Sequence, residues 1–309
     1  MQKLRAAVIG LGETGQHHAR VYAQMEDVDL VAVCDSDCQR LQNITRTWGG
    51  RPFTDFCRLL DEARPDLVSV AVPTSTHFEV ASLTLDAGCH TLVEKPIAAT
   101  VMQAQTLLAL ASMKPRILAV GHIERCNPIV TATKAILDAG DLGQVYRITT
   151  RRVGPSPKRI RDVGCTLDLL THDLDVARYL LQSEPLFVQA ELQHNTHGGL
   201  DDGVAALIRF ESGVIGMLEA DWLSAAKDRR LTITGELGVW EANYLTQTAV
   251  MRASPTAQVN FNVPEEEPLL VELRSFVAAV RGEGRPAATG EDGLRALEMA
   301  VRILEGDRR

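Results

Sequence analysis

The apolar and polar positions of this chain follow two different patterns, which divide it into two halves. In the first half, short apolar runs rich in β-branched residues alternate with stretches whose apolar positions recur at helical spacing. Such alternation predicts an α/β domain built on a doubly wound parallel sheet. The expected strands span residues 4–9, 30–34, 67–72, 90–93 and 117–120, and the expected helices span residues 16–25, 78–87 and 100–113.

The second half contains eight strand-like runs, and short turns such as residues 211–213 join several of them. Runs of this length joined by short turns predict an antiparallel meander. The expected strands span residues 145–152, 187–193, 203–210, 214–222, 230–234, 238–242, 245–251 and 258–261, and helices are expected near residues 129–139, 166–181, 267–281 and 290–305.

These patterns predict two domains, residues 1–121 and residues 122–309. The second is expected to be an α+β domain with a large, mostly antiparallel, open-faced sheet, and the C-terminal helix is a candidate to pack back on the first domain. The alternating residues Val204, Ala206 and Ile208 are assigned to the open face. Because an exposed apolar sheet face is a poor monomer surface, we expect the chain to form a homodimer or homotetramer through this sheet.

A glycine-rich turn follows the first expected strand and precedes a helix. Gly10 allows a tight turn, Gly12 lets the backbone approach a pyrophosphate, and Gly15 permits close packing of helix and strand. The next strand ends in Asp35, whose carboxylate can accept hydrogen bonds from both hydroxyls of a ribose. Strand, glycine turn, helix and acid together predict a Rossmann dinucleotide-binding site.

The identity of the dinucleotide follows from the charge at the end of the second strand. Asp35 repels a 2′-phosphate, and Ser36 and Asp37 follow it without an arginine to receive one. NAD is therefore expected in preference to NADP. Since ligands bind beyond the carboxyl ends of parallel strands, the expected cofactor-binding residues are Gly10, Gly12, Glu13, Thr14, Gly15, Asp35, Pro73, Thr74, His77, Glu94 and Lys95.

Three residues have the chemistry of alcohol oxidation. Lys95 precedes Pro96 at a strand end, while Asp168 and His172 are spaced i, i+4 on an expected helix and so share a face. We expect Lys95 to bind the substrate oxygen, His172 to act as general base and Asp168 to orient the imidazole. Lys95 remains the alternative proton acceptor.

Five cations fall within residues 151–161, in a chain whose formal net charge is −8. Such a run is often only a solvated surface, but glycine and prolines interrupt this one, so we interpret it as an ordered loop that could hold a diphosphate. A weaker candidate for binding a diphosphate is the group of cations formed by Lys227, Arg229 and Arg230. The expected substrate-binding residues are Arg125, Asn127, Arg152, Arg159, Arg161 and His172.

The bulk properties narrow the functional classes. The 309 residues can form two domains, and 45% hydrophobic with 23% charged residues is ordinary for a globular protein. The acidic net charge argues against nucleic-acid binding, and the absence of a run of about 18 apolar residues argues against a membrane-spanning helix. The six cysteines do not have the spacing of a zinc site, so we expect reduced, mostly buried thiols and no bound metal. The N-terminal residues do not resemble a secretory leader, so we expect a cytoplasmic location.

The glycine loop, the Glu94-Lys95-Pro96 motif and the pair formed by Asp168 and His172 together resemble the Gfo/Idh/MocA oxidoreductase family over nearly the whole chain. This resemblance implies an NAD-dependent dehydrogenase. It also implies that Lys95, Asp168 and His172 take the catalytic roles described above.

A narrower resemblance is carried by residues 122–128, 151–155 and 159–164, which look like a group within that family. The members of that group oxidise the 3-hydroxyl of UDP-N-acetylglucosamine to a ketone. The resemblance implies a UDP-sugar substrate and metabolic coupling to a pyridoxal-phosphate aminotransferase that makes the 3-amino sugar of lipid A. Two departures, Cys126 in place of the usual aromatic residue and Cys165 in place of a small one, affect the shape of the pocket.

Other functions remain open at this point. The chain could instead oxidise a UDP-uronic acid, a free sugar or inositol, and a free polyol would have no diphosphate for the arginines to bind. A nucleotide-binding regulator without catalytic activity is the alternative from a different class.

Overall fold

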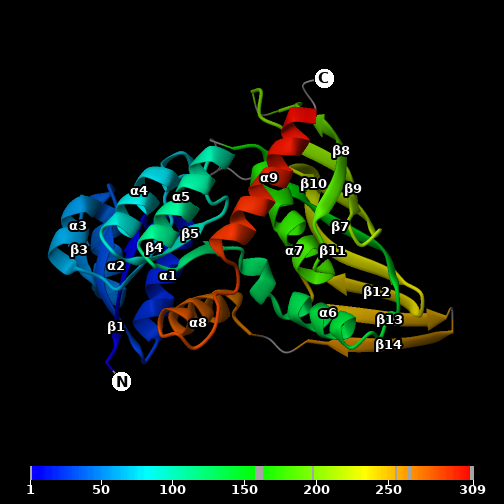
Figure 1. The fold of residues 1–309 in the computed structure, drawn as a ribbon, viewed down its shortest axis with the longest axis horizontal. Helices are drawn as coiled ribbons and strands as arrows, with labels where there is room; N and C mark the ends of the chain where they lie inside the picture. Colours follow the sequence, from blue (N-terminus) through cyan, green and yellow to red (C-terminus); the bar gives the residue numbers. More distant parts are fainter. Residues whose placement is uncertain (1, 157–162, 197, 255, 264–265, 307–309) are drawn as a thin grey trace. The chain divides into compact units, whose positions relative to one another are not determined.

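In a computed structural model, the residues described are 2–156, 163–196, 198–254, 256–263 and 266–306. They form two compact units (Figure 1). The first consists of residues Met1–Ile123 and Leu269–Leu294, and the second of residues Glu124–Pro268 and Arg295–Arg309.

The first unit contains a six-stranded parallel sheet, whose strand order is β3-β2-β1-β4-β5-β6. This order reverses between β1 and β4, which is where doubly wound sheets bind their ligands. The prediction of a doubly wound parallel sheet is confirmed. The strands are β1 (Leu4–Ile9), β2 (Val28–Cys34), β3 (Arg51–Phe53), β4 (Leu67–Val70), β5 (His90–Glu94) and β6 (Leu118–Gly121).

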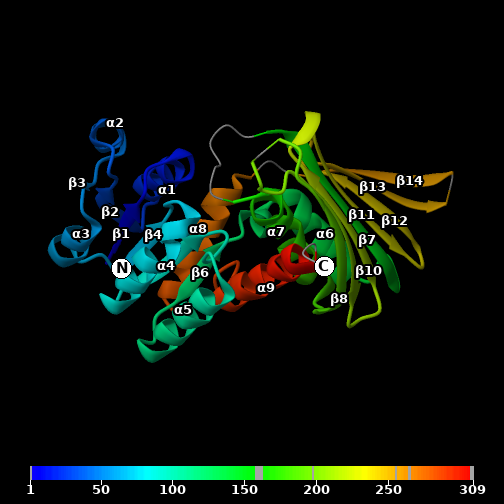
Figure 2. The same cartoon turned by 90° about the horizontal axis from the view of Figure 1, so that it is seen from above.

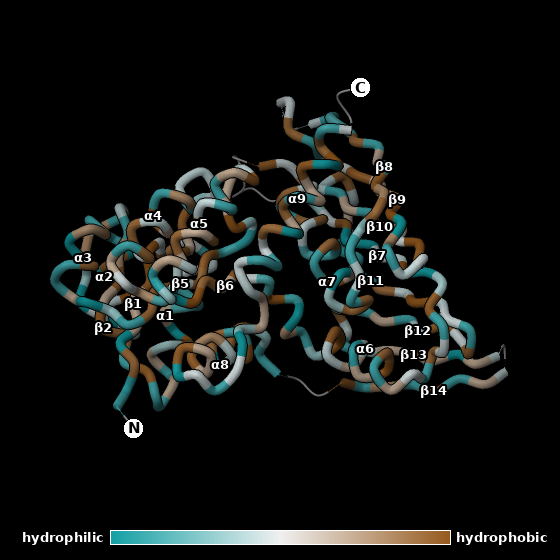
Figure 3. The backbone as a smooth tube through the Cα atoms, viewed as in Figure 1, coloured by the Kyte–Doolittle hydropathy of each residue, from teal (hydrophilic) through white to brown (hydrophobic). Residues whose placement is uncertain are grey.

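The helices of the first unit cover both faces of this sheet. The tube in Figure 3 shows the apolar segments that β1, β4 and β5 contribute to its interior. Two C-terminal segments also belong to this unit, because Leu273 and Phe276 pack with Val8 and Tyr22 in one buried cluster. The helices are α1 (Glu13–Gln24), α2 (Cys38–Trp48), α3 (Phe56–Ala63), α4 (Thr74–Asp86), α5 (Val101–Met113), α8 (Pro268–Val280) and the start of α9 (Gly290–Gly306).

Two details of this unit differ from the expectation. The sequence pattern placed a helix at residues 78–87, but α4 begins at Thr74 because Pro73 precedes it as N-cap, so Thr74 and His77 lie in its first turn. Between residues 37 and 63, α2, β3 and α3 were not predicted. Strand β3 has only three residues, too few to show a period.

The second unit is built on an eight-stranded sheet with the order β14-β13-β12-β11-β7-β10-β9-β8. Its pairs are antiparallel except that β7 runs parallel to β10. The sheet is therefore mostly antiparallel, as predicted, but it is not a simple meander, because β7 enters between β10 and β11. The strands are β7 (Val145–Pro155), β8 (Pro185–Gln193), β9 (Gly203–Phe210), β10 (Ile215–Asp221), β11 (Leu223–Gly235), β12 (Gly238–Asn243), β13 (Thr248–Ser254) and β14 (Ala257–Asn262).

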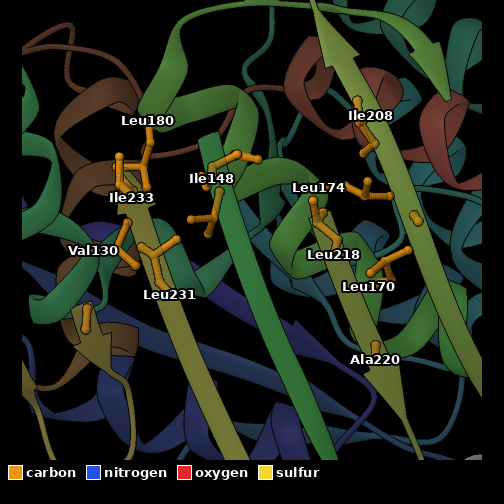
Figure 4. Close-up of a cluster of buried hydrophobic side chains, with 14 of the residues drawn as sticks. Val130, Ile148, Leu170, Leu174, Leu180, Ile208, Leu218, Ala220, Leu231 and Ile233 are labelled. Carbon is orange, nitrogen blue, oxygen red and sulfur yellow. The ribbon is translucent and has the colours of Figure 1, made fainter. Parts of the chain in front are cut away.

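Helical elements cover one face of this sheet, as Figure 2 shows for α6 and α7. Ile148, Leu218 and Leu231 of the sheet meet Leu170 and Leu174 of the helical layer in the core of the unit (Figure 4). The elements are η1 (Ile123–Cys126), which starts at the unit boundary, α6 (Pro128–Asp138), the π-helical turn η2 (Thr166–Leu170), α7 (Thr171–Leu181) and the end of α9.

The other face of the sheet has no covering element among the residues described. The expectation that Val204, Ala206 and Ile208 lie on it is wrong, because these side chains are buried in the core. The alternation is shifted by one residue, so that Leu207, 45% exposed, and its partner Met217, 47% exposed, lie on the open face. A one-residue shift moves every side chain of a strand to the other face.

Two further observations concern the chain as a whole. All six cysteines are free, and four of them are buried, as predicted. None of the helices in the described part combines the length and the apolar character needed to cross a membrane.

Candidate active site

The glycine loop lies at the carboxyl edge of the first sheet. Gly10 has φ +87°, and a Cβ there would lie 2.5 Å from the carbonyl oxygen of Ala71, so this position requires glycine. A Cβ on Gly15 would lie 1.8 Å from the carbonyl oxygen of Gly10. A Cβ on Gly12 would meet nothing within 4 Å, which leaves open space over the start of α1. This geometry is that of a phosphate-binding turn at a helix N-terminus.

Asp35 is attached to this loop. Its Oδ2 accepts a hydrogen bond of 2.6 Å from the backbone N–H of Leu11, and its Oδ1 accepts one of 2.8 Å from the N–H of Asp37. Arg40, whose side chain is 44% exposed, also donates to Asp35 Oδ2 at 3.0 Å. The sequence pattern suggested no arginine beside Asp35. The first turn of α2 supplies one, five residues further along the chain.

Glu94 is the last residue of β5 and Lys95 follows it, at the same edge of the sheet. Glu94 Oε1 lies 3.1 Å from Nε2 of the buried His18 on α1. Gly121, paired with Glu94 across β5 and β6, leaves room for this carboxylate, because a Cβ there would lie 2.8 Å from Glu94 Oε1. Burial alone would raise the pKa of the Glu94 carboxyl, but the hydrogen bond and charge of His18, together with Lys95 and His77, outweigh burial and lower it.

A third buried group joins this pair. Among the described residues, one ligand-type atom each from His18, Glu94 and Glu272 lie within 4.8 Å of one another. The sequence did not reveal this trio, because His18 and Glu272 come from helices far apart in the chain, α1 and α8. The trio includes Glu94, the residue that precedes Lys95.

His77 connects two loops of the same edge. Its Nδ1 lies 2.7 Å from the carbonyl oxygen of Pro96 and its Nε2 lies 2.9 Å from that of Val72. The imidazole is buried, so it holds the loop after β4 against the loop that follows Lys95. Pro73 and Thr74 stand at the start of α4 beside this link.

Replacing His18 by leucine is expected to destabilise the chain by about 1–3 kcal/mol near neutral pH, because a buried carboxylate loses its hydrogen-bond donor. A carboxyl whose pKa is lowered on folding adds to the free energy of unfolding at pH values above the pKa that the group has in the unfolded chain. This contribution disappears as the pH falls through the pKa of the folded state. The loss caused by His18→Leu should therefore shrink as the medium is acidified. Thermal unfolding over a pH series measures this effect.

The matched control is His17→Leu, which alters the exposed neighbour of His18 on α1. It should leave the melting temperature nearly unchanged at every pH. Equal losses for the two variants, or a loss for His18→Leu that does not vary with pH, would contradict the role assigned to the His18–Glu94 contact.

Asp168 and His172 belong to the second unit. Asp168 lies in the π-helical turn η2, and His172 follows in the first turn of α7. Single π-helical turns occur frequently at functional sites. Asp168 is buried and His172 half-buried. The structure thus places both residues on one continuous helical segment, as the i, i+4 spacing predicted.

The start of this segment is held by Asp201. Its Oδ2 accepts a 2.6 Å hydrogen bond from the N–H of Thr166, and its carbonyl oxygen accepts one of 2.8 Å from the N–H of Cys165. A Cβ on Gly164 would lie 1.8 Å from Asp201 Oδ1, so only glycine fits before the turn. Asp201 is thereby a positioning residue for the segment that carries Asp168.

Two of the expected substrate-binding arginines form ion pairs inside the second unit. Arg125 donates two hydrogen bonds of 2.7 Å to Asp175. Arg152, 2% exposed, donates to both oxygens of Asp173 at 3.0 Å and to Glu124 at 2.6 Å. Their partners lie far away in sequence, which is why the charge run alone did not show these pairs.

The interpretation of residues 151–161 as a loop requires a correction. Residues 151–155 are the end of β7, and strand alternation points Arg151 and Arg152 to opposite faces. Arg151 pairs with Glu219 at 2.6 Å on the open face. Arg159 and Arg161 lie outside the described residues.

The buried Arg152 belongs to a larger network beneath α7. Asn127 donates to Glu124 Oε2 at 2.8 Å and accepts a 3.0 Å hydrogen bond from Gln247. Burial raises the pKa of Asp173, despite the opposing effect of Arg152. Asp173, the residue that follows His172, is therefore fixed by hydrogen bonds from the buried guanidinium of Arg152.

Two family models match the chain, one in each half of the sequence. Residues 4–122 match a family described as "Oxidoreductase family, NAD-binding Rossmann fold", and residues 130–241 match the "GFO/IDH/MocA C-terminal domain". The two matches cover the glycine loop, Lys95, Asp168 and His172.

Individual relatives are similar over nearly their whole length. UDP-N-acetylglucosamine 3-dehydrogenase of Acidithiobacillus ferrooxidans is 29% identical, over 98% of this chain and 97% of that protein. Its solved structure superposes with a TM-score of 0.90 at 27% identity, covering 99% of this chain and 98% of that one. Myo-inositol 2-dehydrogenase of Thermotoga maritima is 28% identical, over 95% of this chain and 93% of that protein.

Proposed function

The chain belongs to the Gfo/Idh/MocA oxidoreductase family, and from this premise we propose that it oxidises the 3-hydroxyl of UDP-N-acetylglucosamine to a ketone. It is an NAD-dependent enzyme of the type that acts on sugars and polyols. The observation that carries the proposed substrate is the similarity, over 98% of this chain, to a dehydrogenase of that nucleotide sugar.

The residues of each unit have a defined task in this reaction. When bound, NAD would take a hydride and its two electrons from the carbon, while the hydroxyl would give its proton to a base of this chain. We assign the base to His172, its orientation to Asp168 and the binding of the substrate oxygen to Lys95. The glycine loop and Asp35 would hold the pyrophosphate and the adenosine ribose of NAD.

A second candidate function is supported by the inositol dehydrogenases among the relatives. Inositol carries no diphosphate, so the two functions differ in what the second unit must bind. A screen that follows the absorbance of NADH with UDP-N-acetylglucosamine, a UDP-uronic acid, free N-acetylglucosamine and myo-inositol separates them. Turnover of myo-inositol without turnover of any UDP-sugar would reject the proposed substrate.

The proposed reaction also defines a partner. A 3-keto sugar is the substrate that a pyridoxal-phosphate aminotransferase converts to a 3-amino sugar, so we propose that such an enzyme consumes the product. Coupling is tested by adding an aminotransferase of this type to the assay, which should pull the oxidation towards completion.

Asp35→Ala is expected to narrow the preference for NAD over NADP. The variant loses a charge that opposes a 2′-phosphate by roughly 1–3 kcal/mol, and it also releases Arg40 to meet that phosphate. The ratio of the dissociation constants for the two cofactors measures the change. The double variant Asp35→Ala/Arg40→Ala should recover part of the preference, whereas an unchanged ratio in Asp35→Ala would contradict this role.

We propose that the open face of the second sheet joins copies of this chain. Met217 of β10 and its partner Leu207 of β9 are large apolar side chains exposed on this face. Light scattering at micromolar concentration should give a mass at least twice that of the 33.7 kDa chain. The variant Leu207→Glu/Met217→Glu should shift the mass towards the monomer, and a monomeric wild type would contradict the proposal.

A further inference from the structure

Arg229 is a partly exposed cation on the helix-covered face of the second sheet. It lies on β11 directly opposite Arg152 of β7, so both side chains leave the sheet on the same face. The Arg229 side chain is 32% exposed, against 2% for Arg152. Arg229 therefore stands at the rim of the network in which Arg152 is enclosed.

The nearest carboxylate holds Arg229 only loosely. Its guanidinium approaches Glu124 Oε1 to 4.0 Å, while Arg152 donates to the same oxygen at 2.6 Å. Glu124 and Asp173 are thus engaged mainly by Arg152. Arg229 keeps donors available on a guanidinium whose fork suits the oxygens of a phosphate.

The surroundings of Arg229 favour an incoming anion. Burial and the charge of Arg152 lower the pKa of Arg229, with Glu124, Asp173 and Asp168 acting in the opposite direction. A second positive charge beside Arg152 is costly, and an anion placed against Arg229 relieves that cost. Arg152, directly opposite Arg229, donates to Asp173, and Asp173 follows His172 in α7, so Arg229 borders the network that holds the residue next to the proposed base.

In a nucleotide sugar, the diphosphate lies close to the 3-hydroxyl of the same sugar ring. The diphosphate is attached at C1 of the sugar ring, and only C2 separates C1 from the carbon that bears the 3-hydroxyl. A residue that binds the inner phosphate must therefore lie next to the residues that act on the 3-hydroxyl. Arg229 meets this condition through Arg152 and Asp173, the residue that follows His172.

We propose that Arg229 binds the diphosphate of the substrate and is the residue that selects a nucleotide sugar over a free polyol. This inference rests on the proposed function. It replaces the earlier assignment of that task to Arg152, whose guanidinium is enclosed by Glu124 and Asp173.

The test is the binding of UDP and of uridine to the full chain, measured by calorimetry in the presence of NAD. Arg229→Met should weaken UDP binding about tenfold or more, the scale of a lost charge-assisted hydrogen bond to phosphate. Binding of uridine, which has no phosphate, and binding of NAD should change little. Arg229→Lys should recover part of the affinity for UDP, because it restores the charge without the fork.

The matched control is Arg230→Met. The sequence also suggested Arg230 as a candidate to bind a diphosphate, but Arg230 is the next residue on β11, points to the face opposite Arg229 and pairs with Asp228 at 2.8 Å. Its loss should therefore leave UDP binding unchanged. Equal weakening by the two variants, or equal weakening of uridine and UDP by Arg229→Met, would overturn the proposal for Arg229.

The outcomes also separate this inference from the proposed reaction. If the wild type oxidises UDP-N-acetylglucosamine and Arg229→Met binds UDP normally, the reaction stands and the role of Arg229 is rejected. If the wild type binds UDP through Arg229 but does not oxidise this sugar, the inference stands and the proposed substrate is wrong. If the wild type does not bind UDP, the inference for Arg229 is rejected, and the oxidation assay with UDP-N-acetylglucosamine decides the proposed reaction separately.

Discussion

Lys95→Ala is expected to lower kcat by roughly 100-fold or more, because the variant loses an ammonium that binds the substrate oxygen and stabilises negative charge on it. Lys95 follows Glu94, which His18 holds in place, so its position is set by the sheet edge and not by the cofactor. NAD binding should therefore be nearly unaffected. Steady-state turnover and NAD titration of the same preparation measure the two quantities.

Lys114→Ala is a suitable control, since Lys114 is an exposed lysine in the same unit. It should retain full turnover. If Lys95→Ala turned over as fast as this control, Lys95 would have no part in the reaction. A parallel loss of NAD affinity would instead show that Lys95 serves the cofactor.

Arg152→Met is expected to destabilise the second unit by about 3–5 kcal/mol, because it leaves Glu124 and Asp173 buried without their shared cation. The Glu124 pKa is lowered on folding, since Arg152 and Asn127 outweigh the opposing effect of burial. The Glu124 carboxylate therefore stabilises the folded chain at pH values above the pKa that it has in the unfolded chain, and this stabilisation is lost as the pH falls. The effect of Arg152→Met should accordingly be largest near neutral pH, and denaturant unfolding at several pH values will show whether it is.

The adjacent arginine offers an internal control. The Arg151 side chain is 42% exposed and pairs with Glu219 on the open face, where an ion pair contributes about 1 kcal/mol or less. Arg151→Met should therefore be nearly neutral. If it destabilised the chain as much as Arg152→Met, the buried network would not be the source of the loss.

The elements with a clear period were predictable from the sequence. Strands β1 and β5 each contain a buried apolar stretch because helices cover both faces of the parallel sheet. The glycine loop is recognisable from the spacing of its glycines. The helical segment that carries Asp168 and His172 was predictable for the same reason, but its π-helical turn at Asp168 was not. Local spacing carries this information.

Properties that depend on distant segments were not predictable. The position of β7 between β10 and β11 arises from pairing over dozens of residues, and the face of β9 that meets the core depends on register. The cluster of cations at residues 151–152 indicated a binding surface, because its neutralising partners Glu124 and Asp173 could not be seen in the run itself. Arg229 carried only a weak signal for its role, which depends on pairing with Arg152.

Helix α8 determines when the first unit can fold during synthesis. Leu273 and Phe276 complete the buried cluster around Val8 and Tyr22, and Glu272 of the same helix lies with His18 and Glu94. A ribosome must therefore have made nearly the whole chain before the unit that begins at the N-terminus can close its core. An N-terminal fragment ending at residue 123 would leave this cluster exposed, so the unit should be recoverable alone only when residues 269–294 are supplied, joined to it or as a separate peptide.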